Sequence, residues 1–301
     1  MQQINATERD IFSLWAGEGV VVAVGAGGLV MLSEDDGCTW ETLDAKTTSD
    51  LWGVWGRSAT DFWVTGRSRT TCTLLHRRLS RGRLSFRKEV TRKKMRGSAL
   101  VGCGGDVLLA GNDVHDAGIL RTADDGKQWS QVISGHVNDI AAHGPVVIAA
   151  MDDSTVMEST SGGDDWQTRR LTKECCHLKS VWFDDVGHAF AAGTASTNAI
   201  FRRDPDGTWR QLDLPNRLYT HGTHGHGRHW VIAYDYMTGS DASRVWGSKL
   251  WTSSDGASFD ATDHVPGTLL SIVVTESGAV ITGGLGGLLL RVRDSAGSHH
   301  Q

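Results

Sequence analysis

The amino-acid sequence predicts an all-β fold, a seven-bladed β-propeller whose blades are four-stranded antiparallel sheets. Three observations predict it. The 301 residues include 37 Gly and only 4 Pro. Apolar runs of about four to six residues alternate with turns rich in Gly and Asp, which is typical of short strands. One turn motif recurs along the chain at the length of a propeller blade.

The recurring motif is clearest at Ser33–Trp40, which reads Ser-x-Asp-x-Gly-x-Thr-Trp. Its closing aromatic residue has counterparts 37 to 50 residues apart, namely Trp40, Phe86, Trp129, Trp166, Trp209 and Phe259. One seventh of the chain is about 43 residues, so each interval accommodates one blade. Each blade is expected to contain four strands, named A to D in chain order.

The apolar runs place the strands of each blade. In the first blade they predict Ile11–Trp15, Val20–Gly25, Leu29–Ser33 and Thr39–Leu43. The later B strands are expected at Phe62–Gly66, Val107–Gly111, Val146–Ala150, Ala189–Gly193, Trp230–Ala233 and Val280–Gly283. The C strands are expected at Thr73–Leu75, Ile119–Arg121, Thr155–Met157, Ile200–Arg202, Leu250–Trp251 and Leu288–Leu290.

The seventh blade lacks a strand D of its own. Residues Gln2–Thr7 precede the first predicted strand and are expected to fill that place. Such closure removes an unpaired sheet edge. We therefore expect one domain over residues 1–295 and a disordered tail over residues 296–301.

The motif carries a resemblance to a known family. The segments SEDDGCTW (33–40) and TADDGKQW (122–129) are similar to the BNR/Asp-box repeat. With SVWFDDVGHAFAAG (180–193), the chain resembles the photosystem stability/assembly factor-like branch of the sialidase-like superfamily. The resemblance implies a propeller scaffold, and assembly factors of this branch dock through an arginine-rich patch. Asp-boxes also occur in sialidases, lectins and sorting receptors, so the box itself specifies a fold.

Within the box, the Asp is expected to accept backbone hydrogen bonds inside the C–D turn, and the Trp to pack between blades. Two further columns recur in strand A. Small residues at Ser13, Gly53, Ser180 and Ser271 suit close approach near the axis. The column of Trp15, Trp55 and Trp182 suits inter-blade packing or a stacking platform for a ligand.

The sialidase alternative lacks its residues. That family requires three arginines, one of them in an Arg-Ile-Pro motif, and a Tyr nucleophile paired with Glu. No Arg-Ile-Pro occurs here, and the tyrosines Tyr219, Tyr234 and Tyr236 lie in one blade. A glycan-binding or glycoside-hydrolysing protein therefore stays the alternative to a non-enzymatic scaffold. A metal- or small-ligand-binding propeller is the second alternative.

Residues 76–96 are strongly basic, with ten Lys or Arg and a single acidic residue, although the net charge of the whole chain is −5. The B–C and D–A loops of a blade emerge on the same face. We therefore predict a partner-binding surface on that face formed by Arg67, Arg69, Arg92, Lys93, Lys94, Arg96 and, from the long loop 235–248, Trp246. An acidic protein is the expected partner. Nucleic acid is disfavoured, because aromatic residues are not interleaved with the basic ones.

Four histidines lie close together at positions 221–229. In an extended strand His224 and His226 point the same way, which makes them candidates for a two-point metal chelate. No Cys or carboxylate stands at ligand spacing, so the alternative is an exposed His-rich loop. We expect no cofactor.

The remaining expectations concern location and assembly. The N-terminus shows no signal-peptide pattern, no window is apolar enough for a membrane span, and the five cysteines have no framework spacing. These features predict a protein of the cytoplasm, and we expect the chain by itself to be a monomer.

Overall fold

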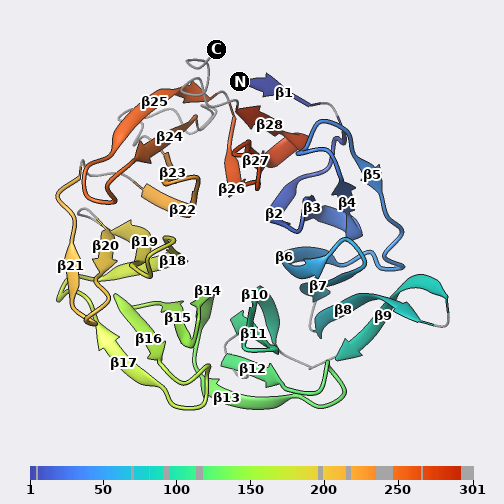
Figure 1. Cartoon of the computed structure of the whole chain (residues 1–301), viewed down its shortest axis with the longest axis horizontal. Helices are drawn as coiled ribbons and strands as arrows, with labels where there is room; N and C mark the ends of the chain where they lie inside the picture. Colours follow the sequence, from blue (N-terminus) through green and yellow to red (C-terminus); the bar gives the residue numbers. More distant parts are fainter. Residues whose placement is uncertain are drawn as a thin grey trace.

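The computed structural model of the chain describes residues 1–4, 6–68, 71–80, 82–90, 95–112, 118–195, 199–214, 218–234, 247–265 and 267–292. Seven four-stranded antiparallel sheets surround one axis, as Figure 1 shows. The predicted seven-bladed propeller is confirmed. Within the described ranges the helices are two 3-10 turns, η1 (Ala26–Gly28) and η2 (Leu285–Gly287), and neither is long and apolar enough to cross a membrane.

The strands follow the chain from blade to blade. Blades 1 to 3 consist of β2 (Ile11–Gly17), β3 (Val20–Gly25), β4 (Val30–Ser33), β5 (Glu41–Thr42); β6 (Asp50–Ser58), β7 (Asp61–Ser68), β8 (Thr71–Ser80), β9 (Arg83–Val90); and β10 (Arg96–Cys103), β11 (Asp106–Asn112), β12 (Gly118–Thr122), β13 (Ser130–Ser134). Blades 4 and 5 consist of β14 (Val137–His143), β15 (Val146–Met151), β16 (Thr155–Ser159), β17 (Gln167–Arg170); and β18 (Cys176–Phe183), β19 (Ala189–Ala195), β20 (Ile200–Arg203), β21 (Trp209–Gln211). Blades 6 and 7 consist of β22 (Leu218–Gly225), β23 (Arg228–Tyr234), β24 (Ser248–Ser253), β25 (Asp260–Val265); and β26 (Leu269–Val274), β27 (Val280–Gly284), β28 (Leu289–Val292), β1 (Gln2–Gln3).

The two ends of the chain close the ring in blade 7. Strand β1 pairs antiparallel with β28, with Gln2 opposite Arg291 and Gln3 opposite Leu290. The N–H of Ile4 donates to the carbonyl of Leu289 at 2.9 Å. This confirms that the N-terminal segment supplies the missing strand D, while the predicted tail 296–301 lies outside the described residues.

The core is divided among the blade interfaces. Seven hydrophobic clusters of buried residues occur, and each joins one pair of neighbouring blades. The B strands are the most buried, and all six residues of β3 are buried. Because each sheet buries both faces against its neighbours, the stability of the ring depends on the contacts between blades.

The box turns form as the sequence predicts. In blade 1 the Asp35 carboxylate accepts from the N–H of Thr39 at 2.8 Å, and Ser33 Oγ accepts from the N–H of Gly37 at 2.9 Å. Gly37 has φ +78, the left-handed region that favours glycine. The Trp40 indole donates to the Gly37 carbonyl at 3.1 Å and packs in the cluster shared by blades 7 and 1. These residues are structural.

The column of tryptophans in strand A packs between blades. A Cβ on Gly56, Gly102 or Gly222 would lie at most 3.0 Å from a tryptophan ring of the preceding blade, namely Trp15, Trp55 or Trp182 respectively. Each of these tryptophan side chains therefore packs against a glycine in strand A of the following blade. This confirms the packing interpretation over the stacking platform.

Candidate functional site

A cavity of about 430 Å³ lies on the propeller axis, at the face where the A strands begin and the B strands end. Residues from all seven blades line it, and we call it the axial cavity. Its lining residues are Phe12, Trp52, Arg67, Arg96, Gly97, Ser98, Asn138, Lys179, Thr194, Thr220, His221, Tyr234 and Leu270. This is the B–C/D–A face on which the sequence predicts partner binding.

A β-bulge in every A strand builds this lining. In blade 1, Ile11 is opposite Gly25 and Ser13 is opposite Val24, so Phe12 is the extra residue. The same shift occurs once near the start of each of the other A strands. The seven bulged residues are Phe12, Trp52, Ser98, Asn138, Lys179, Thr220 and Leu270, and all seven line the axial cavity. A bulge re-aims a side chain, so the fold presents one variable residue per blade; we call this set the bulge ring.

Three of the residues that directly follow a bulge tie neighbouring blades together. Asp139, Ser180 and Ser271 each accept a hydrogen bond from a backbone N–H of the next blade's A strand, at 2.9, 3.3 and 2.9 Å. Gly53 stands at the same position, where a Cβ would meet the Ser98 carbonyl at 2.9 Å. The small-residue column thus permits close approach, as predicted, and its polar members also join the blades.

The bulge ring is apolar on one side. Leu270, Phe12 and Trp52 follow one another around the ring in blades 7, 1 and 2. The rings of Phe12 and Trp52 stack with centroids 4.0 Å apart and an interplanar angle of 3°. Trp52 is 36% exposed. A large aromatic surface is therefore preorganised and open to a ligand.

Three cations face the same cavity. Arg67 is the penultimate residue of β7, and its Cζ lies 5.5 Å from the centroid of the Trp52 ring. Arg96 begins β10, and Lys179 is the bulged residue of β18. The sequence predicted Arg67 and Arg96 for one face, and the structure brings them to one cavity. Lys179 was missed.

The other predicted partner-binding residues, Arg69, Arg92, Lys93, Lys94 and Trp246, lie outside the described residues.

The polar side of the ring offers hydrogen-bond acceptors. Asn138 uses Nδ2 to donate to Asp152 Oδ1 at 3.1 Å and to the Leu178 carbonyl at 2.8 Å, which leaves its Oδ1 as an acceptor. Ser98 Oγ donates to the Val137 carbonyl at 2.9 Å and keeps its lone pairs. Burial lowers the pKa of His221 to about 4, so this wall residue is neutral at neutral pH.

The basic segment 76–96 is distributed over several surfaces. Arg77 is 5.5 Å from the centroid of the Phe62 ring, and burial lowers its pKa. Arg78 pairs with Asp125 of blade 3 at 3.6 Å. Among the described residues of this segment, Arg96 alone lines the axial cavity. The run of charges in the sequence is therefore not one patch, because a strand and its hairpin partner carry alternate residues to opposite faces.

The prediction that His224 and His226 point the same way and could chelate a metal is wrong. His226 lies in the β22–β23 turn with φ +51, so strand alternation does not apply to it. His226 Nε2 is 2.7 Å from the Glu276 carbonyl oxygen of blade 7, whereas His224 Nδ1 is 3.3 Å from Asp185 of blade 5. The two rings thus contact opposite neighbours. The side chain of His224 is only 6% exposed, so the exposed-loop alternative fails for it as well.

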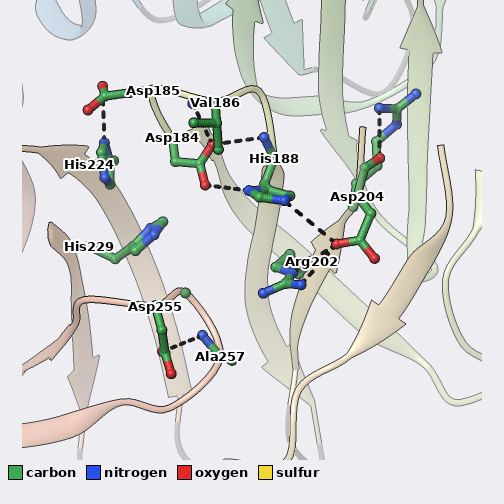
Figure 2. Close-up of polar contacts among 12 residues, drawn as sticks. Asp184, Asp185, Val186, His188, Arg202, Asp204, His224, His229, Asp255 and Ala257 are labelled. Atoms are coloured by element: carbon green, nitrogen blue, oxygen red, sulfur yellow. Dashed lines mark hydrogen bonds and ion pairs between the residues drawn. The ribbon is translucent and has the colours of Figure 1, made fainter. Parts of the chain in front are cut away.

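Figure 2 shows where His224 lies, beside His229 and facing Asp185. In the adjacent turn, His188 Nδ1 is 2.6 Å from Asp184 Oδ2. No group of three or more His, Cys, Asp or Glu side chains in the described part of the chain is arranged to hold a metal ion. The His224–Asp185 contact joins blades 5 and 6, whereas the His188–Asp184 contact lies within blade 5.

The bulge ring itself was missed by sequence reasoning. Its members share no residue type, and a single-residue bulge interrupts the alternation from which strand faces are deduced. One signal was available. The ring occupies the position just before the small-residue column of strand A, and that position varies from Phe to Lys between blades.

The sequence matches no protein-family model and no curated protein. Solved structures match in fold. One described as YCF48 bound to D1 peptide has 20% identity and a TM-score of 0.72, over 97% of this chain and 96% of that chain. YCF48 from Cyanidioschyzon merolae has 16% identity and a TM-score of 0.70, over 97% and 98%. Streptogramin B lyase has 11% identity and a TM-score of 0.70, over 96% and 95%.

At sequence identities this low, the structural matches show a shared fold and nothing more. Both YCF48 structures span nearly the whole propeller, in accord with the resemblance to the photosystem assembly factor-like branch. An enzyme with the same fold aligns about as well, so the fold does not decide between binding and catalysis. The chain is similar to YCF48 in its seven-bladed architecture.

Proposed function

We propose that this propeller is a non-enzymatic interaction scaffold that binds an extended acidic segment of a partner protein in the axial cavity. One observation carries the proposal. A single cavity, formed by all seven blades, combines a stacked aromatic surface with three cationic side chains. Because the lining residues stand on strands and bulges, the site is preorganised, which reduces the entropy lost on binding.

An extended peptide supplies the groups that this cavity recognises. An aliphatic or aromatic side chain has a platform in Phe12, Trp52 and Leu270. An Asp or Glu side chain is attracted to Arg67, Arg96 and Lys179 on the other side. Main-chain N–H groups meet acceptors in Ser98 and Asn138.

YCF48 has the same fold as this chain, and one of its solved structures is bound to the D1 peptide. It supports a peptide as the ligand class here. The D1 peptide is a ligand of YCF48. At 20% identity, only the architecture can be inferred for this chain.

The glycoside-hydrolase alternative has less support. Hydrolysis of a glycosidic bond generally uses two carboxyl groups on either side of the bond. The described residues that line the axial cavity include no Asp or Glu. Tyr234, the tyrosine of this wall, donates its hydroxyl to the Leu269 carbonyl, and burial raises its pKa.

A display library of random short peptides tests the proposal. Selection on the full chain at low salt should enrich peptides with one or more acidic residues near an aliphatic or aromatic residue. Truncation of a central aromatic anchor costs on the order of 2 kcal/mol, so Trp52→Ala should weaken binding about 30-fold. Lys179→Glu should weaken it at low salt and reduce its salt dependence.

The matched control is Lys173→Glu, which makes the same charge change at an exposed residue of the loop between blades 4 and 5. It should bind the selected peptides as the parent chain does. Selected peptides without acidic residues, or equal affinity in Trp52→Ala and the parent, would contradict the proposal.

A further inference from the structure

The hairpin of β8 and β9 in blade 2 extends farther than any other outer hairpin of the ring. Its strands have ten and eight residues, whereas the other C strands have four to six and the other D strands two to six. In Figure 1 this hairpin projects beyond the circumference on the right. Residues at its tip therefore lack the neighbouring blade that covers the equivalent residues nearer the axis.

One face of this hairpin carries an exposed pair of leucines near its tip. Leu79 and Leu84 are directly opposite each other on the two strands, and they are 61% and 39% exposed. The next pair on the same face is Arg77 and Phe86, and the Phe86 ring is 5.7 Å from that of Phe62. The two leucines thus continue, into solvent, the face that packs against blade 1 nearer the axis.

Basic side chains lie near the leucines along the same hairpin. Arg83 adjoins Leu84 in the chain, and Arg87 and Lys88 follow on the same strand; all three are exposed. Cross-strand alternation places Arg83 and Arg87 on the face opposite the leucines and Lys88 on the leucine face. Between residues 76 and 96 the sequence has a single acidic residue, Glu89.

We propose that the tip of the β8–β9 hairpin binds the surface of an anionic lipid bilayer. Leu79 and Leu84 enter the boundary between head groups and acyl chains, while Arg83, Arg87 and Lys88 contact the anionic head groups. Exposed aliphatic residues flanked by Lys and Arg are the chemistry of peripheral membrane binding. Nucleic acid would call for aromatic side chains that stack on bases, and the exposed pair is aliphatic.

The charge distribution favours contact through a basic surface such as this hairpin. The whole chain carries −5, so an anionic surface repels it except where basic residues gather. The tip lies at the C–D end of blade 2, whereas the axial cavity opens at the B–C/D–A face. A propeller held by this hairpin therefore leaves the axial cavity accessible to a partner, and the proposal does not depend on what that cavity binds.

Vesicle co-sedimentation of the full chain tests the proposal. Vesicles of phosphatidylcholine with about 30 mol % phosphatidylserine should retain the protein, and vesicles of phosphatidylcholine alone should retain far less. Arg83→Gln/Lys88→Gln should lower the partition coefficient about 30-fold, at about fivefold for each charge. Leu79→Ser/Leu84→Ser should lower it about tenfold and leave the melting temperature unchanged, because both side chains are exposed.

The matched control is Arg170→Gln/Lys173→Gln, which removes two exposed cations, one at the end of β17 and one in the loop between blades 4 and 5, and should bind vesicles like the parent. Three results would overturn the proposal. Vesicle binding that survives the leucine substitutions would reveal charge attraction alone. Binding of a single-stranded RNA, with no binding of vesicles, would assign the hairpin to nucleic acid. A parent dimer that the leucine variant converts to a monomer would assign the leucines to a second copy of the chain.

Discussion

Replacing Asp139 by Ser should raise the stability of the propeller at neutral pH and remove part of its pH dependence. Asp139 follows the bulge of blade 4 and accepts from the N–H groups of Val181 and Ile140, each at 2.9 Å. Burial raises its pKa from 3.8 to about 6, and these hydrogen bonds offset only part of that effect. Ser180 and Ser271 perform the same inter-blade role with a hydroxyl and no charge.

The magnitude follows from the pKa. A shift of about 2 units corresponds to about 3 kcal/mol of free energy of unfolding, lost when Asp139 ionises in the folded state. Because the folded-state pKa lies above the unfolded one, the native chain binds more protons between them, and stability falls as pH rises through about 6. Between about pH 5 and pH 7.5 the expected loss is about 1.4 kcal/mol. Asp139 keeps some solvent exposure, so these figures are upper limits.

Urea denaturation followed by near-ultraviolet circular dichroism measures the effect at each pH. The free energy of unfolding of Asp139→Ser minus that of the parent should increase as pH rises from about 5 to about 7.5. Asp213→Ser, at an exposed carboxylate, is the control and should show a constant difference. A difference for Asp139→Ser that is constant or decreases with pH would mean that the buried carboxylate does not destabilise the fold when it ionises.

Three further predictions concern contacts between neighbouring blades. Gly102→Ala should destabilise the fold by about 3 kcal/mol, measured by urea denaturation, because its Cβ would lie 1.9 Å from the Trp55 ring; a neutral result would mean that the ring can move aside. Ser271→Ala should cost about 2 kcal/mol in the same assay, since a buried N–H of blade 1 loses its acceptor, and an unchanged midpoint would show that the bond is dispensable. His224→Ala should leave the metal content of the purified protein unchanged by elemental analysis, because His224 pairs with Asp185; loss of stoichiometric zinc or nickel would restore a metal site.

The architecture was accessible from the sequence because it repeats. Each box places a Gly with positive φ and an aromatic anchor at a fixed point, as at Gly37 and Trp40, so counting boxes counts blades. The closure by Gln2 and Gln3 followed from a seventh blade that lacked its outer strand. Periodic signals of this kind add up over six copies of the aromatic anchor, so one weak copy changes the predicted blade length little.

The site was less accessible because its residues do not repeat. Arg67 and Arg96 were found through charge and loop position, and they reach the axial cavity. Phe12, Trp52 and Lys179 carry as much of its chemistry, but only the bulge turns them toward the axis. A bulge depends on pairing between strands, which the local sequence does not specify.

Photo-crosslinking from the bulge ring tests whether a peptide binds in the axial cavity. A photoreactive amino acid in place of Leu270 stands in the axial cavity, and one in place of Val186, which is 69% exposed, stands in a turn that joins strands A and B on the opposite face. We expect an acidic peptide selected on the full chain to cross-link to position 270 and not to position 186. Cross-linking at position 186 with none at position 270 would contradict binding in the axial cavity.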